Sequence, residues 1–143
     1  MKSVRIHSFG DNSVVRVEEI DKPVPGSGEL LVRVAAAAVN PVDLQIREGK
    51  LESFLAHTLP ITLGCDVAGT VESGEGFKAG DSVYAYLNLA RLGAFADFAI
   101  VKTEEAALMP KSLDFVHAAA VPVAALTAWQ ALFDTANDCS TTD

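Results

Sequence analysis

Short runs of apolar and β-branched residues, separated by glycine and proline, make up most of the chain up to about residue 110. In the run from 30 to 39, Val32 and Val34 alternate with Leu31 and Arg33, which is the period of a strand with two different faces. The pattern predicts strands at 14–20, 30–39, 67–72, 82–86 and 94–101, with turns at 23–28 and 78–81. Many short strands with this punctuation are typical of a closed or partly closed antiparallel barrel.

Helical signals occur in two places. Asn40 is a suitable cap for a short helix that starts at Pro41 and ends near Gly49, because proline is tolerated in a first turn. After Pro110 the period changes, and residues 112–115 are expected to open one helix. Pro122 is expected to begin a second helix that runs to about residue 133. The chain is therefore predicted to be mainly β, with short helices and a C-terminal helical segment.

Composition narrows the possible functions. The chain has 143 residues, half of them hydrophobic, which suits one domain with a sizeable core. A net charge of -8 argues against nucleic acid and anionic membranes as partners. The first seven residues contain no long apolar stretch of the signal-peptide kind, and the apolar segment 118–133 is too short to span a bilayer and is interrupted by Pro122. We expect a soluble cytoplasmic protein.

Several common chemistries find no support in the residue pattern. Cys65 and Cys139 form neither a disulfide framework nor a zinc-binding spacing, and the histidines at 7, 57 and 117 are expected on separate elements. No Ser/His/Asp or Cys/His arrangement stands out. The segment 74–80 resembles a dinucleotide phosphate loop, but its last glycine spacing is one residue too long and it precedes a strand. A hairpin turn is the better interpretation, since Glu75 would also repel phosphate.

Two segments resemble known signatures. Residues 37–43 (AAVNPVD) and 63–69 (LGCDVAG) are similar to two motifs of the medium-chain dehydrogenase/reductase family, in the branch of zinc-free quinone and enoyl reductases. Zinc-dependent members carry a cysteine where Asn40 stands and a histidine where Cys65 stands, so the resemblance implies that no metal is bound. The acidic residue of the second motif remains as Asp66. The resemblance extends from residue 1 to about 136 and implies a GroES-like, partly open β-barrel.

The resemblance also implies a division of the chain. Residues 1–111 would form the GroES-like catalytic-domain barrel, and 112–136 a helical connection toward a Rossmann domain that this chain lacks. Residues 137–143 form a polar tail. By resemblance, the function is the N-terminal catalytic-domain portion of an enzyme that transfers hydride from NADPH or NADH to a quinone or enone. Because the glycine-rich phosphate loop is missing, we expect the chain alone to bind no cofactor and to be nearly inactive.

The family implies roles for particular residues, and each has a structural alternative. Asn40 would act in catalysis and contact the nicotinamide ribose or a substrate carbonyl, a role compatible with capping the helix. Asp43 would also belong to the catalytic residues, supporting the cleft from behind, or be a solvated first-turn carboxylate. Thr127 would approach the nicotinamide, or bond back to its own helix. Cys65 would border the substrate cleft, or be a buried free thiol. Tyr86, together with Tyr84, would border that cleft or belong to the core.

Two other functions remain open at this point. The chain is also compatible with a non-enzymatic GroES-like binding or assembly module, because a fold does not fix a function. A truncated subunit that docks onto a partner through residues 112–133 is the third possibility. The segment 118–133 holds more apolar surface than one barrel face should cover, and we therefore expect a homo-oligomer. Its large apolar residues are Val121, Val123, Leu126, Trp129, Leu132 and Phe133.

Overall fold

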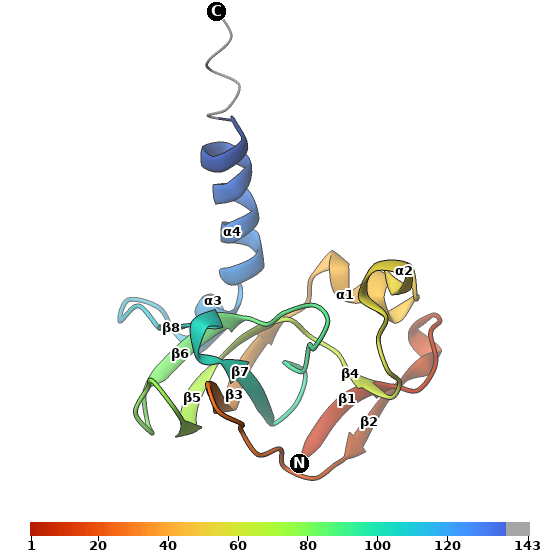
Figure 1. The fold of residues 1–143 in the computed structure, drawn as a ribbon, viewed down its shortest axis with the longest axis horizontal. Coiled ribbons are helices and arrows are strands. Elements are labelled where there is room, and N and C mark those ends of the chain that lie inside the picture. The colour runs from red at the N-terminus through yellow and green to blue at the C-terminus, as the bar shows by residue number, and fades with distance from the viewer. Residues whose placement is uncertain (137–143) are drawn as a thin grey trace, which may run out of the picture.

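The computed structural model describes residues 1–136, and its antiparallel strands form two sheets that do not close on each other (Figure 1). The smaller sheet has the order β2-β1-β4 and consists of β1 (Lys2–Ile6), β2 (Val15–Glu19) and β4 (Ile61–Thr62). The larger sheet has the order β7-β3-β5-β6-β8 and consists of β3 (Glu29–Ala38), β5 (Asp66–Gly74), β6 (Ser82–Tyr86), β7 (Phe98–Lys102) and β8 (Ala106–Leu108). The predicted mainly β, partly open GroES-like barrel is confirmed.

The first core lies on one face of the larger sheet. In β3, Leu30 and Val32 are fully buried, and they pair with Val101 and Ala99 of β7. Alternate residues of a strand share a face, so neighbouring strands contribute matching apolar positions to this side. The other members of the core are Val67, Val71, Val83, Ala85, Leu87 and Ala94. The sheet also contains a very close backbone approach, because a Cβ built on Gly69 in β5 would lie 2.1 Å from the carbonyl oxygen of Arg33 in β3.

A second core joins the smaller sheet to the first helix. It is formed by Ile6, Ile46, Ile61, Leu63, Cys65 and Leu92, all buried. The predicted strand 94–101 needs correction here, because its first half serves this region and only Phe98–Lys102 forms β7. Phe95 donates its N–H to Leu63 O at 2.9 Å and accepts from Val4 N at 2.7 Å, so its backbone follows the smaller sheet.

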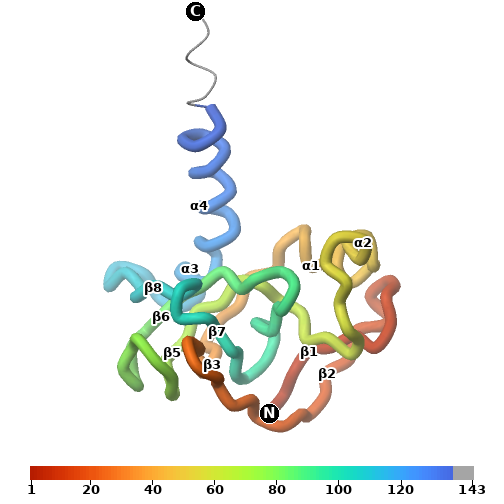
Figure 2. The backbone as a smooth tube through the Cα atoms, viewed as in Figure 1, coloured from red at the N-terminus to blue at the C-terminus, as the bar shows by residue number. Residues whose placement is uncertain are grey.

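The helices lie at one end of the sheets (Figures 1 and 2). Helix α1 (Pro41–Arg47) occupies the predicted position, followed by a short α2 (Glu52–Leu55) that was not predicted. Helix α3 (Phe115–Ala119) begins at Phe115 because the Asp114 side chain accepts from the His117 N–H at 2.8 Å. Helix α4 (Pro122–Trp129) continues into a π-helical turn η3 (Gln130–Thr135), and Figure 2 shows it projecting away from the sheets. The 3₁₀ turns are η1 (Asn12–Val14) and η2 (Thr103–Glu105).

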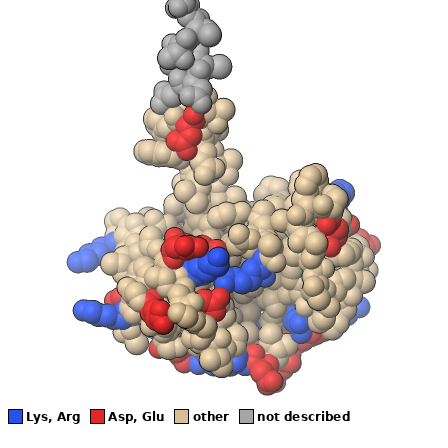
Figure 3. Space-filling model, viewed as in Figure 1, with Lys and Arg blue, Asp and Glu red and all other residues tan. Residues whose placement is uncertain are grey.

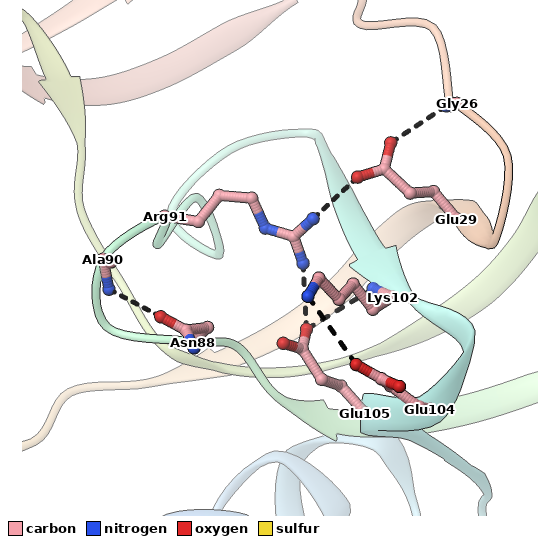
Figure 4. Close-up of polar contacts among 8 residues, drawn as sticks. All are labelled: Gly26, Glu29, Asn88, Ala90, Arg91, Lys102, Glu104 and Glu105. Carbon is pink, nitrogen blue, oxygen red and sulfur yellow. Dashed lines mark hydrogen bonds and ion pairs between the residues drawn. The ribbon is translucent and has the colours of Figure 1, made fainter.

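Arg91 fixes the connection between β6 and β7. Its guanidinium bridges two carboxylates, with Nη1 at 2.8 Å from Glu29 Oε1 and Nη2 at 2.9 Å from Glu105 Oε2 (Figure 4). In the same loop the Asn88 side chain accepts from the Ala90 N–H at 2.9 Å. The loop is thereby attached to the start of β3 and to η2, which lie far apart in the sequence.

None of the helices within residues 1–136 has the length and apolar character needed to cross a bilayer. The predicted polar tail, 137–143, lies outside the described residues.

Candidate functional site

Asn40 lies where β3 ends and α1 begins. Its backbone N–H donates to Asp43 Oδ2 at 2.8 Å, and its carbonyl oxygen accepts from the Asp43 N–H at 3.0 Å. The backbone of Asn40 and the side chain of Asp43 therefore start the helix, while the Asn40 side chain makes no capping bond. That side chain turns instead to the second motif, where Nδ2 lies 3.0 Å from Asp66 Oδ2 and 3.7 Å from Cys65 Sγ.

Asp66 joins three parts of the molecule. It is the first residue of β5 and pairs with Ala38 on one side and Tyr86 on the other. Its carboxylate accepts a hydrogen bond from the Asn40 amide and another from the backbone N–H of Val123 in the first turn of α4. The Val123 nitrogen lies 3.2 Å from Oδ1 and 3.3 Å from Oδ2. One fully buried carboxylate thus connects the large sheet, the Asn40 amide and the projecting helix.

The environment of this cluster disfavours negative charge. Burial raises the pKa of Asp66 to about 6, even though the Asn40 amide and the Val123 N–H stabilise its ionised form. Burial also raises the pKa of Asp43, opposed by the Asn40 backbone N–H. Burial, with the nearby Asp43 and Asp66 carboxylates, raises the pKa of the Cys65 thiol to about 12. The thiol is therefore neutral and unreactive at physiological pH.

Two of the alternatives left open by the sequence are now decided in structural terms. Asp43 is only 3 % exposed, so it is not a solvated first-turn carboxylate. Cys65 is fully buried in the second core, so its proposed place on the substrate cleft needs correction. A thiol without exposed surface touches no bound molecule directly, and Cys65 is the buried free thiol of the alternative interpretation.

A largely apolar groove lies beside the cluster, between the β6–β8 edge and α4. Its volume is about 500 Å³, within the range of pockets that bind small molecules. Tyr84 and Tyr86 line one side, both half-buried, and Leu126 and Trp129 of α4 line the other. Since Tyr86 pairs with Asp66 in the sheet, the groove begins next to the polar cluster.

Thr127 lies one helical turn beyond Val123, so both are on the same side of α4. The Thr127 side chain is exposed, and its hydroxyl makes no hydrogen bond within residues 1–136. The alternative in which it bonds back to its own helix is therefore not observed. No hydrogen bond joins Thr127 to Asn40 among the described residues, and Asn40 is connected to the first turn of α4 through Asp66.

The segment 74–80 is a hairpin connection between β5 and β6, as the sequence predicted. Its glycines do not open a helix, so no phosphate-binding turn is formed there. Among residues 1–136, no three His, Cys, Asp or Glu side chains are arranged to hold a metal ion.

We expect the purified protein to contain no stoichiometric zinc, because Asn40 and Cys65 occupy the positions where zinc-dependent relatives have ligands. Elemental analysis after exhaustive dialysis checks this, and Asn40→Cys with Cys65→His is the matched variant. Zinc retained at one ion per chain by the unmodified protein would contradict the prediction.

Sequence reasoning missed the central position of Asp66 and the part played by Val123. Asp66 was recognised only as the acidic residue that survives in the second motif. Val123 contributes a backbone N–H, which no residue pattern reveals. An acidic residue placed at the start of a strand, beside a motif already singled out, was the one available signal.

Comparisons with known proteins agree with this architecture. Residues 26–111 match the alcohol dehydrogenase GroES-like domain family. The chain is 40 % identical to a chloroplastic quinone-oxidoreductase homolog of Spinacia oleracea and 37 % identical to the quinone oxidoreductase of Rattus norvegicus, over 96 % and 95 % of this chain but only 43 % and 42 % of those proteins. It thus spans less than half the length of these relatives.

Solved structures show the same relationship. Escherichia coli quinone oxidoreductase, complexed with NADPH, superimposes with a TM-score of 0.86 at 28 % identity, covering 94 % of this chain and 41 % of that one. A human synaptic vesicle membrane protein VAT-1 homolog-like protein gives a TM-score of 0.87 at 32 % identity, covering 96 % and 44 %. The chain therefore belongs to the alcohol dehydrogenase GroES-like domain family, within the medium-chain dehydrogenases/reductases.

Proposed function

We propose that this chain forms the catalytic-domain portion of an NAD(P)H-dependent oxidoreductase that reduces a quinone or an activated carbon–carbon double bond. The observation that carries the proposal is the Asn40–Asp66 pair, in which Asp66 is the strand neighbour of Tyr86, a residue that lines an apolar groove of about 500 Å³. The similarity to quinone oxidoreductases over nearly the whole chain supports the same activity.

The residues of this chain would orient and shield the reactants. Tyr86 and Trp129 line the groove from β6 and α4, and aromatic side chains are suited to contact a planar conjugated substrate. Asn40 is half-buried and offers a hydrogen-bonding group held in place by Asp66. Asp43 fixes the backbone of Asn40 from behind. These are positioning roles, and excluding water from the groove is the main contribution of the apolar side chains.

A nicotinamide cofactor, when bound, supplies the hydride. The residues present fit only its nicotinamide end, where Asn40 and Thr127 are the proposed contacts. The pyrophosphate would find no glycine-rich turn at a helix start within residues 1–136. We propose that this chain by itself holds the cofactor poorly, and that cytoplasmic localisation and the division at residues 111 and 136 apply as the sequence predicts.

The test is to compare the 143-residue chain with a fusion to the remaining portion of a quinone oxidoreductase. Calorimetry should detect no low-micromolar NADPH binding by the chain alone, and clear binding by the fusion. In the fusion, Asn40→Ala should lower kcat/KM by about tenfold, the equivalent of one hydrogen bond to the reacting molecules. Its melting temperature should change little by comparison.

Asn88→Ala is the matched control, since Asn88 is exposed and lies in the Arg91 loop. It should leave kcat/KM unchanged. Tight NADPH binding by the isolated chain, or full turnover by the Asn40→Ala fusion, would contradict the proposed function.

A docking role is the second candidate, and the projecting helix favours it. Leu126, Trp129, Leu132 and Phe133 are 46, 60, 63 and 50 % exposed, and the Trp129 and Phe133 rings lie 4.5 Å apart. Figure 3 shows the helix as an uncharged column with one acidic patch, and Asp134 is the single charged residue in 122–136. Exposed apolar surface of this kind normally binds another surface.

We accordingly expect the isolated chain to form homodimers or larger oligomers through this helix. Sedimentation velocity at micromolar concentrations should show association, and Leu132→Glu should shift the population to monomer by placing a charge in the contact. Val24→Glu is the control, because Val24 is 86 % exposed outside the helix. A monomer under all conditions would contradict the prediction.

A further inference from the structure

The Asn40 side chain has donors and an acceptor, and the structure separates them. An asparagine amide carries two N–H groups on Nδ2 and a carbonyl oxygen, Oδ1, that only accepts. Nδ2 lies 3.0 Å from Asp66 Oδ2 and 3.7 Å from Cys65 Sγ. Both Asp66 and Cys65 are fully buried, so the two N–H groups face the interior of the protein.

The acceptor of Asn40 has a different environment. Among residues 1–136, no group donates a hydrogen bond to Oδ1, and Oδ1 is not one of the buried side-chain atoms left without a partner there. Asn40 itself is half-buried, at the turn between β3 and α1. Oδ1 is therefore the part of this amide that a molecule arriving from solvent would meet.

Asp66 maintains this orientation. Above pH 6 its carboxylate is ionised and can only accept, so an amide rotated by a half-turn would place Oδ1 against a like-charged oxygen at hydrogen-bond distance. The carboxylate cannot turn away easily, because the Val123 N–H holds it at 3.2 Å. The rotated amide would lose one hydrogen bond and gain a repulsion, which makes it strongly disfavoured.

We infer that Asp66 is a positioning residue that sets the polarity of Asn40, so that the site recognises a hydroxyl or N–H donor on the bound molecule rather than a carbonyl oxygen. The inference rests on the proposed function and narrows the kind of group that Asn40 can recognise. A substrate carbonyl would have to meet Oδ1, an acceptor facing an acceptor. A ribose hydroxyl of the cofactor or a phenolic hydroxyl of a reduced quinone would each be a suitable donor.

The orientation is tested directly by NMR of the Asn40 side-chain amide in the full chain, assigned with Asn40→Asp. We expect its two Nδ2 protons to exchange with water at least about tenfold more slowly than those of Asn88, which make no hydrogen bond among the described residues. The signals should also shift as Asp66 titrates. This experiment needs no ligand and no substituted Asp66.

Asp66→Asn should abolish both the slow exchange and the titration shift. The new amide at position 66 can donate as well as accept, so it no longer forces the Asn40 side chain into a single orientation. Asp21→Asn, which alters an exposed carboxylate, should retain both. Asn40 protons that exchange as fast as those of Asn88, without a pH-dependent shift, would overturn the inference even if Asp66→Asn proved too unstable to study.

The polarity of recognition is tested with three small probes: nicotinamide riboside, tetramethylhydroquinone and tetramethylbenzoquinone. Asn40→Leu should weaken the binding of the probe whose hydroxyl meets Oδ1 by about threefold to tenfold. The affinity for the benzoquinone, which has no donor, should stay unchanged. If the variant binds the riboside more weakly, the cofactor is the source of the donor. If it binds the hydroquinone more weakly, the reduced substrate is the source. Selective loss of the benzoquinone would overturn the inference. The probes are applied to the fusion. If none of them binds the unmodified fusion, the proposed function fails, and the exchange experiment on the chain still decides the orientation.

Discussion

The stability difference between Asp66→Asn and the unmodified protein should change by about 2–3 kcal/mol between pH 4 and pH 8, in favour of the variant at the higher pH. The carboxyl group is fully buried, and its pKa rises from 3.8 to about 6 on folding. Ionising it inside the folded protein is therefore costlier than ionising it in the unfolded chain. Asparagine cannot ionise and carries no such cost.

The direction follows from proton binding. Between pH 3.8 and about 6 the folded protein holds a proton on Asp66 that the unfolded chain has already released. The contribution of Asp66 to stability is thus complete below pH 3.8 and is lost as the pH rises through about 6. Asp43, whose pKa is also raised by burial, acts in the same direction but is present in both proteins.

Urea unfolding followed by far-UV circular dichroism measures the effect at each pH. The hydrogen bonds that asparagine fails to reproduce at Asn40 and Val123 lower the stability of the variant by a nearly constant amount, which cancels when the two pH values are compared. Asp21→Asn should show no change of this kind. A stability difference that stays flat from pH 4 to pH 8 would mean that Asp66 is not held in a desolvated site.

Gly69→Ala should destabilise the protein by about 3 kcal/mol or more, enough to unfold much of a marginally stable domain. The added methyl group would lie 2.1 Å from the carbonyl oxygen of Arg33 and 2.9 Å from a methyl of Val32. The first contact is with backbone in the middle of the sheet, so no side-chain rotation relieves it. The strands β3 and β5 would have to separate, next to the register shift between Val34 and Ala36.

Gly26→Ala is the control for this substitution. Its added methyl would meet only the Glu29 side chain, at 3.4 Å, which is an ordinary van der Waals contact, so the cost should stay near or below about 1 kcal/mol. Thermal melts of the two variants make the comparison. If the Gly69→Ala protein had the same melting temperature as the Gly26→Ala protein, the two strands could move apart at little cost.

The sequence predicted the elements whose periodicity is complete within one segment. β6 has the predicted bounds, and β5 and α1 agree to within about two residues. β1, β4 and β8 were not predicted. The two residues of β4 contain no period, and Ile61–Thr62 is a strand only through its pairing with β1. The first half of 94–101 was misassigned since its alternating pattern does not reveal which sheet it will follow.

In the candidate site, too, the sequence predicted local features and missed those that depend on distant segments. The importance of Asn40 was visible in a motif, because residue type and spacing carry that information. Its orientation was not, since it depends on Asp66, 26 residues later, and on a backbone N–H of Val123. The burial of Cys65 and Asp43 likewise results from packing among segments distant in the chain.

The double role of Asp66 couples two regions of the molecule. The Asp66 carboxylate accepts one hydrogen bond from the Val123 N–H in the first turn of α4 and another from the Asn40 amide. A partner that tilts the helix would change the hydrogen bond between Val123 and Asp66, and Asp66 orients the Asn40 amide for its ligand. By linkage, if such a partner strengthens binding of the ligand, the ligand strengthens binding of the partner by the same factor. Ligand binding at Asn40 and partner binding on α4 would then be thermodynamically linked.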